Sequence, residues 1–142
     1  TVLTPNLPEA GVLLGERAPE NPKEMRRAAE RLRERMTHAG ARWVVLKGGH
    51  LSHGDAIDLV TDGDRMIELA LPRVDTKNTH GTGCTLSAAI AALLPQSPDA
   101  PTAIRRAKDY LAGALAAADR LDVGRGHGPV HHFHAMWRTA EK

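Results

Sequence analysis

The alternation of hydrophobic and polar positions along the chain predicts four short strands. Residues 1–4 form a β-branched run, and residues 42–47 are continuously apolar in the middle, as in a strand covered on both faces of a parallel sheet. Residues 56–61 and 66–71 flank an Asp-Gly pair at positions 62–63, which is typical of a hairpin turn. The sequence therefore predicts a sheet that contains an antiparallel hairpin.

Helical spacing of apolar residues predicts helices between and after these strands. A short helix is expected up to about Leu14, and a longer one after Asn21, which has Glu24 at the position of a capping box. Gly40 is expected just past the end of the longer helix. An alanine-rich helix should stop near Pro95. A last helix should carry one apolar face made of Ile104, Ala107, Leu111, Ala114, Leu115 and Ala118.

Strands that alternate with helices imply right-handed crossovers and a layered α/β fold. We therefore expect an α/β sheet that is mostly parallel, with the antiparallel hairpin added. The sequence has no internal repeat and no clear second domain, and the tail from Asp122, rich in Gly and His, predicts irregular structure. In open α/β sheets, ligands bind beyond the carboxyl ends of the strands. Polar residues at those ends are therefore the candidates for a functional site.

Composition and charge exclude several classes of function. The 142 residues are 42% hydrophobic with a formal net charge of +2, which gives no basis for a nucleic-acid or membrane partner. The longest apolar run, residues 86–94, is too short to cross a bilayer, and no signal-peptide pattern is present. A single cysteine excludes an intramolecular disulfide, and its free thiol is typical of a reducing, cytoplasmic setting. Because the chain begins with Thr1 in a strand, we expect a processed or truncated product.

The most informative stretch is residues 77–92, where polar residues and glycines run directly into the alanine-rich helix. Gly81 and Gly83 allow a ligand close to the backbone. The first amides of a helix are unpaired at the positive end of the helix dipole, which makes a ready anion site. Cys84 falls in the first turn, where a thiolate is favoured as base or nucleophile, unless it only packs the helix start as a small buried residue. His80, just before the loop, is expected to make a structural hydrogen bond.

Two further polar groups are expected at the carboxyl ends of strands: Asn6 with Glu9, and Lys47 with the two glycines that follow it. If these groups and residues 81–84 converge on one rim, they supply the metal ligands, positive charge and amides of a phosphoryl-transfer site. By themselves, Asn6 and Glu9 are equally typical of a helix cap, and Lys47 of a solvated strand end. The histidines at 131–134 lack a cysteine pair or a His-Glu-x-x-His pattern, so we favour no metal site there.

A resemblance to a known family is carried by residues 78–89, which read Asn-Thr-His-Gly-Thr-Gly-Cys-Thr-Leu-Ser-Ala-Ala. This stretch resembles the anion-hole signature of the ribokinase-like superfamily. In detail it resembles the hydroxymethylpyrimidine/phosphomethylpyrimidine kinases, in which a cysteine stands where other members have an aspartate as general base. Asn6-x-x-Glu9 resembles the motif associated with Mg²⁺ and phosphates, and Val-Leu-Lys-Gly-Gly-His at 45–50 resembles the strand whose lysine reaches the nucleotide phosphates. Residues 126–133 resemble the carboxyl-terminal segment of the same kinases.

The resemblance runs from residue 1 to about residue 137 and implies a ribokinase-like fold. It implies that residues 1–142 are the carboxyl-terminal portion of a single kinase domain, because family members are substantially longer and their amino-terminal part is missing here. The implied reaction transfers the γ-phosphoryl group of ATP, with Mg²⁺, to hydroxymethylpyrimidine and then to its monophosphate in thiamin biosynthesis.

The same resemblance implies a role for each candidate residue. Cys84 would take the proton of the acceptor hydroxyl, while backbone amides of the loop would hold the developing charge. The amides are those of Gly81, Thr82, Gly83 and Cys84; the residues implied for the nucleotide phosphates are Lys47 and Thr79; those implied for Mg²⁺ are Asn6 and Glu9.

Two alternatives to a pyrimidine kinase stay open from the sequence. The first is a pyridoxal kinase of the same superfamily, some of which also use cysteine. The second is a non-catalytic fragment that binds nucleotide without turnover. Because the acceptor pocket is missing, we expect the isolated chain to have little kinase activity. We also expect an open strand edge that a second copy or a complementary amino-terminal fragment covers.

Overall fold

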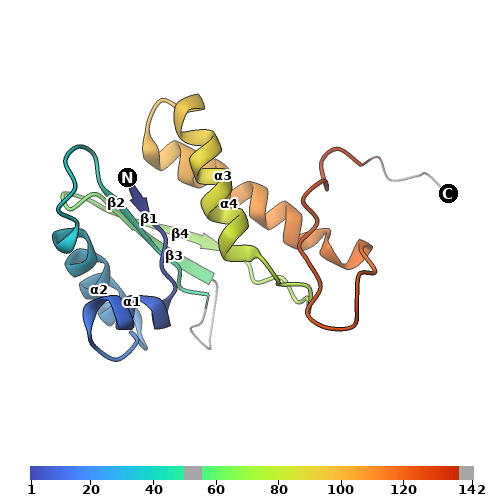
Figure 1. The fold of residues 1–142 in the computed structure, drawn as a ribbon, viewed down its shortest axis with the longest axis horizontal. Helices are drawn as coiled ribbons and strands as arrows, with labels where there is room; N and C mark the ends of the chain where they lie inside the picture. Colours follow the sequence, from blue (N-terminus) through green and yellow to red (C-terminus); the bar gives the residue numbers. More distant parts are fainter. Residues whose placement is uncertain (50–55, 138–142) are drawn as a thin grey trace. The chain divides into compact units, whose positions relative to one another are not determined.

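The computed structural model describes residues 1–49 and 56–137. The chain divides after Arg73 into two compact units, Thr1–Arg73 and Val74–Lys142. The first unit holds the sheet with helices α1 and α2, and the second holds helices α3 and α4 (Figure 1). In the part of the chain that the structure describes, no helix is long and apolar enough to span a bilayer.

The sheet of the first unit has four strands in the order β1-β2-β3-β4. Strands β1 (Val2–Leu3) and β2 (Trp43–Leu46) pair in parallel, whereas β2 with β3 (Ala56–Thr61) and β3 with β4 (Met66–Leu71) pair antiparallel. The mixed α/β class is confirmed, but antiparallel pairing takes a larger share of the described sheet than expected. The hairpin joins the sheet through a second antiparallel pair, β2 with β3, and the one parallel pair spans only the two residues of β1.

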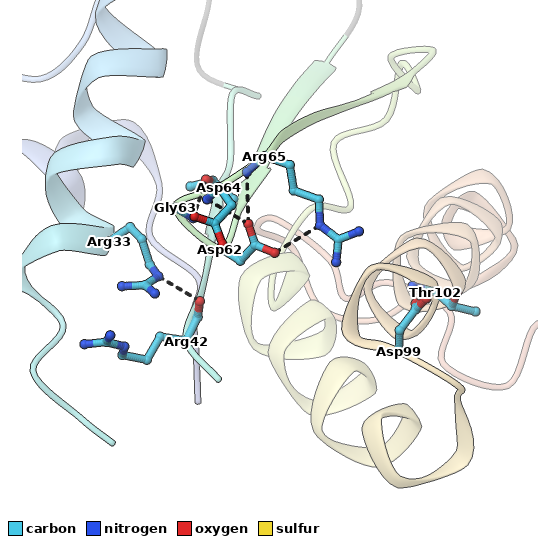
Figure 2. Close-up of polar contacts among 9 residues, drawn as sticks. Arg33, Arg42, Asp62, Gly63, Asp64, Arg65, Asp99 and Thr102 are labelled. Carbon is cyan, nitrogen blue, oxygen red and sulfur yellow. Dashed lines mark hydrogen bonds and ion pairs between the residues drawn. The ribbon is translucent and has the colours of Figure 1, made fainter. Parts of the chain in front are cut away.

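The hairpin turn lies where the Asp-Gly pair predicts it. Asp62 Oδ1 accepts hydrogen bonds from the N–H groups of Asp64 and Arg65, both at 3.1 Å, and Gly63 takes a left-handed φ of 104° (Figure 2). Partial burial raises the pKa of Asp62, but these bonds and the Arg65 guanidinium outweigh it and leave that pKa below its usual value. The turn therefore fixes the register of β3 and β4.

Helices α1 (Leu7–Leu14) and α2 (Pro22–Arg35) pack against each other, and α2 also packs on β2 and β3. The apolar residues of α2 that recur at helical spacing, Met25, Ala28, Ala29 and Leu32, are buried, so the expected amphipathic helix is confirmed. The core of this unit consists of Leu7, Ala10, Leu14, Met25, Ala28, Ala29, Leu32, Val44, Leu46 and Leu59.

Two details of α2 differ from the sequence prediction. Asn21 Oδ1 accepts from the Glu24 N–H at 3.0 Å, but the Glu24 carboxylate accepts from the Glu20 N–H at 2.9 Å instead of closing a capping box. The helix also ends at Arg35, five residues before Gly40, because Met36 is already extended and packs against the core. A local competitor therefore decides the start of α2, and packing of Met36 against the core decides its end.

The second unit is built from α3 (Thr82–Leu93) and α4 (Ala100–Ala116), each followed by a short 3₁₀ turn at Leu94–Gln96 and at Ala118–Arg120. Asp99 caps α4 by accepting from the Thr102 N–H at 2.7 Å (Figure 2). The two helices pack against each other. The apolar face predicted for α4 is only partly buried, because Leu111 and Leu115 stay partly exposed. Its buried members are Ile104, Ala107, Ala114 and Ala118.

The tail after α4 and its 3₁₀ turn, residues 121–137, is irregular, as predicted.

Candidate active site

In the first unit, the structure brings Asn6 and Lys47 together. They follow the parallel strands β1 and β2 and form a bridge to each other, and the Lys47 N–H donates to Pro5 O at 2.9 Å. Because both strands end at the same edge, the two side chains start from neighbouring backbone positions. The predicted proximity of the Asn6 and Lys47 groups is therefore confirmed within this unit.

Asn6 and Glu9 form a reciprocal capping box at the start of α1. Asn6 Oδ1 accepts from the Glu9 N–H at 2.8 Å, and Glu9 Oε2 accepts from the Asn6 N–H at 2.7 Å. Each side chain thus uses one polar atom locally. Glu9 is exposed, and its Oε1 has no hydrogen-bond partner among residues 1–49 and 56–137. The interpretation of Asn6 and Glu9 as a helix cap is confirmed, and the cap leaves Glu9 Oε1 available for a ligand.

Lys47 is partly buried, and no ion pair to it occurs within the described ranges. The backbone just after Lys47 lies close to β3 at Gly48. The Gly48 N–H donates to the buried carboxylate of Asp58 at 3.0 Å, and a Cβ on Gly48 would lie 1.9 Å from the carbonyl oxygen of Ile57. Lys47 therefore ends its strand on a rigid backbone. His50, which closes the matching motif, lies outside the described residues.

In the second unit, the glycine loop leads directly into α3, as predicted. Gly81 is the N-cap residue with a left-handed φ of 83°, and no side chain of the described residues caps the helix. The Thr85 N–H donates to Gly81 O at 2.8 Å, and the Thr82 N–H makes a long contact of 3.4 Å to Thr79 O. The N–H groups of Gly83 and Cys84 have no partner within the described ranges. Such amides at the positive end of a helix favour an anion.

The Cys84 side chain is exposed, at the third position of α3. The alternative in which Cys84 is a buried packing residue is therefore wrong. Cys84 is one of the residues that line an open pocket of about 690 Å³, together with alanines of α3, Tyr110 and His132. The sulfur is therefore accessible from this pocket. Thr79, predicted to contact nucleotide, is also exposed beside the loop.

Sequence reasoning missed the residues that hold this loop. Asn78 is 5% exposed and donates to Asp119 Oδ1 at 3.0 Å. The His80 backbone N–H donates to Gly128 O at 3.1 Å, so the structural bond expected of His80 is made by its backbone, while its imidazole is exposed. Because these partners are about 40 to 50 positions apart in the chain, no local spacing signals them.

The histidines of the tail have structural partners. The ring of buried His131 meets Trp137 edge-on at 4.7 Å between centroids, and His134 packs on Tyr110 at 5.4 Å. Within residues 1–49 and 56–137, no group of three or more His, Cys, Asp or Glu side chains is arranged to hold a metal ion.

The predicted site residues thus fall into two sets. Asn6, Glu9 and Lys47 belong to the first unit, whereas Thr79 and residues 81–84 belong to the second. Each set has the local geometry predicted for it, and the rim that they are expected to share stays a prediction.

Comparison with known proteins identifies a family. The phosphomethylpyrimidine kinase family model matches residues 1–131. A hydroxymethylpyrimidine/phosphomethylpyrimidine kinase of Rhizobium meliloti is 48% identical over 96% of this chain and 50% of its own length. The corresponding kinase of Escherichia coli is 44% identical, also over 50% of its length. The chain therefore spans about half the length of these curated relatives.

Solved structures give the same fold. A Bacillus subtilis pyridoxal kinase in an ADP complex has a TM-score of 0.85 and 34% identity, over 97% of this chain and 50% of that one. A Bacteroides thetaiotaomicron structure described as a phosphomethylpyrimidine kinase has a TM-score of 0.72 at 23% identity, which supports the fold alone. The glycine loop before α3, the exposed cysteine and these matches agree, and the chain belongs to the phosphomethylpyrimidine kinase family.

Proposed function

We propose that this chain carries the nucleotide and phosphate half of a kinase that phosphorylates hydroxymethylpyrimidine and its monophosphate with ATP. The observation that carries the proposal is the start of α3, where unpartnered amides and an exposed thiol lie side by side. Phosphoryl transfer needs little covalent chemistry from the protein and depends on positioning and charge stabilisation. The start of α3 supplies both, together with a base.

In the proposed reaction, Cys84 Sγ takes the proton of the acceptor hydroxyl. The hydroxyl oxygen then forms a bond to the γ-phosphorus. The bond between the γ-phosphorus and the β,γ-bridging oxygen breaks, and ADP leaves. The amides of Gly83 and Cys84 donate to the phosphoryl oxygens on which charge is spread. Lys47 and Thr79 contact the nucleotide phosphates. A general base must lie within reach of the proton that it takes. The exposure of Cys84 supports this role.

Mg²⁺ fits the residues at the start of α1. The free Oε1 of Glu9 is a hard oxygen ligand on an exposed side chain, and Mg²⁺ in phosphoryl-transfer sites keeps much of its water shell and needs one or two carboxylates. Asn6 orients Glu9 through the capping box. When bound, Mg²⁺ neutralises charge on the transferring phosphates.

The lone thiol, exposed and unable to form an intramolecular disulfide, supports a reducing, cytoplasmic location for this chemistry.

A pyridoxal kinase is the second candidate, because solved pyridoxal kinases of Bacillus subtilis and Staphylococcus aureus match this chain with TM-scores of 0.85. The curated relatives at 44–48% identity are pyrimidine kinases, and they favour the first candidate. Both candidates share the roles of Cys84 and Lys47. They differ only in the acceptor alcohol.

The experiment combines nucleotide binding by this chain with turnover by the product of its complete genomic reading frame. We expect ADP to bind the chain, to raise its melting temperature and to slow exchange of the Gly83 and Cys84 amides. We expect a reading-frame product of the relatives' full length to phosphorylate hydroxymethylpyrimidine faster than pyridoxal, and these 142 residues alone to turn over neither alcohol.

Each outcome has a distinct meaning. Faster turnover of pyridoxal would assign the second candidate, and heat protection by ADP without turnover by either polypeptide would indicate a non-catalytic nucleotide-binding protein. Absence of any nucleotide effect on the loop amides would contradict the whole proposal. Robust turnover by the 142-residue chain would show that it needs no further acceptor pocket.

A further inference from the structure

Asn78 is a buried polar side chain just before the glycine loop. Its Nδ2 donates two hydrogen bonds, to Ala118 O at 3.2 Å and to Asp119 Oδ1 at 3.0 Å. Thr76 Oγ1 donates to the same Asp119 oxygen at 2.5 Å and accepts from the Asn78 N–H at 3.1 Å. A buried amide that lost these partners would be strongly destabilising. The network therefore fixes Asn78 against the 3₁₀ turn Ala118–Arg120.

The other side of Asn78 faces the tail at Gly128. A Cβ on Gly128 would lie 2.2 Å from Asn78 Oδ1, so the asparagine occupies space that only glycine leaves open. The carbonyl of Gly128 also accepts from the His80 N–H, and His80 forms a bridge with Pro129. The backbone between Asn78 and Gly81 is thus fastened to two segments that lie far along the chain.

We propose that Asn78 is a positioning residue that sets the orientation of the unpartnered amides at the start of α3. Asn78 lies three positions before Gly81, and the contact between the Thr82 N–H and Thr79 O spans the turn at Gly81. Its importance for phosphoryl transfer rests on the proposed function. Its structural part, that the Asn78 side chain orders the loop through Asp119, can be tested without any substrate.

The chemistry of the network distinguishes asparagine from aspartate at this position. The amide donates to two acceptors, Ala118 O and the Asp119 carboxylate. A carboxylate at position 78 would face both acceptors without a proton to donate and would repel Asp119. Asn78→Asp should therefore release the loop, although the two side chains have nearly the same size.

A second change should restore part of the order. In the double variant Asn78→Asp, Asp119→Asn, the new amide at position 119 donates to the new carboxylate at position 78, and the like charges are gone. The bond to Ala118 O stays lost, so the rescue is incomplete. A side chain that merely fills space would show no such dependence on position 119.

The experiment measures amide hydrogen exchange by NMR on this chain, at the bonded N–H groups of His80 and Thr85. We expect Asn78→Asp to speed exchange at both by about tenfold or more, since each lost bond contributes roughly a factor of ten. The double variant should recover part of that factor. The matched control is Asn21→Asp, an N-cap of α2 where aspartate works as well as asparagine, and it should leave both rates unchanged.

Asn78→Asp exchange rates equal to those of the control would overturn the proposal, as would a double variant no better than the single one. If Asn78→Asp unfolds the unit, seen as faster exchange at Ile104 in α4, Asp119→Ala replaces it. That variant removes only the exposed acceptor and should speed His80 exchange several-fold. ADP affinity is measured in parallel. If Asn78→Asp speeds exchange at the loop amides but the chain binds no ADP, the positioning role of Asn78 stands and the proposed kinase function is refuted. The two failures are therefore distinguishable.

Discussion

Among the described glycines of the first unit, Gly48 leaves the least room for an added Cβ, so Gly48→Ala should be strongly destabilising. The added Cβ would lie 1.9 Å from the backbone carbonyl oxygen of Ile57 and 2.8 Å from Met25 Cε. The methionine end can move, but the carbonyl belongs to β3 and is held in the sheet. Relief therefore requires the end of β2 to separate from β3, which also strains the bond between the Gly48 N–H and Asp58.

The magnitude follows from the kind of neighbour involved. Overpacking against side chains costs about 1–3 kcal/mol. A clash with backbone belongs at the upper end or above, and weakening the bond to a buried carboxylate adds about 1 kcal/mol or more. We expect a loss of roughly 3–4 kcal/mol in the free energy of unfolding of the first unit. For a unit of this size that is a fall of about 12–32 °C in melting temperature.

Urea unfolding followed by the fluorescence of Trp43, which is buried in β2, measures this loss. Trp137→Phe provides the background, because the chain has only two tryptophans. Gly49→Ala is the matched control, since no described atom lies within 4 Å of its Cβ position and its φ is not positive. If Gly48→Ala and Gly49→Ala unfold within 0.5 kcal/mol of each other, a margin typical of neutral surface changes, the close approach of Gly48 to β3 is refuted.

Three further predictions concern charge and the site. Cys84→Ala should lower kcat of the full reading-frame product by about 10²–10⁴-fold, as for loss of a general base, with ADP affinity unchanged in calorimetry; retained kcat would exclude the thiol as base. Lys47→Met should weaken ADP binding by roughly 10–100-fold, as for a lost charge-assisted bond, whereas the exposed Lys23→Met should not. The hydrogen bond from Arg31 holds the pKa of Glu16 below its usual value, so the stabilisation by this pair is present above that usual value and is lost as pH falls through the lowered pKa of the folded state. Glu16→Gln should abolish that acid-side loss in thermal melts; an unchanged slope would show that the pair contributes nothing.

Local signals explain what could be predicted from the sequence. Strands β3 and β4 have the predicted bounds because an Asp-Gly turn fixes the register on both sides. The cap at Asn6 and the start of α3 after Gly81 also depend on neighbours within three or four positions. Local signals did not predict whether Cys84 is exposed or buried, because helix spacing alone does not show which face of α3 is covered.

Non-local partners explain what could not be predicted. The bond between Asn78 and Asp119 joins residues 41 positions apart, and no spacing rule connects them. Competition among near neighbours also escapes prediction. The Glu24 carboxylate fits a capping box by its position, but the N–H of Glu20 and the Arg17 guanidinium bind it instead. Residue spacing alone does not show which of several nearby donors binds a carboxylate.

The bare start of α3 has a thermodynamic consequence. Helices α1, α2 and α4 each begin with a side-chain cap, from Asn6, Asn21 and Asp99, whereas α3 begins at Gly81 with none. A side-chain cap contributes about 1 kcal/mol. A phosphate at this position would serve as the cap that the sequence omits, so occupancy by nucleotide and the persistence of α3 would rise and fall together.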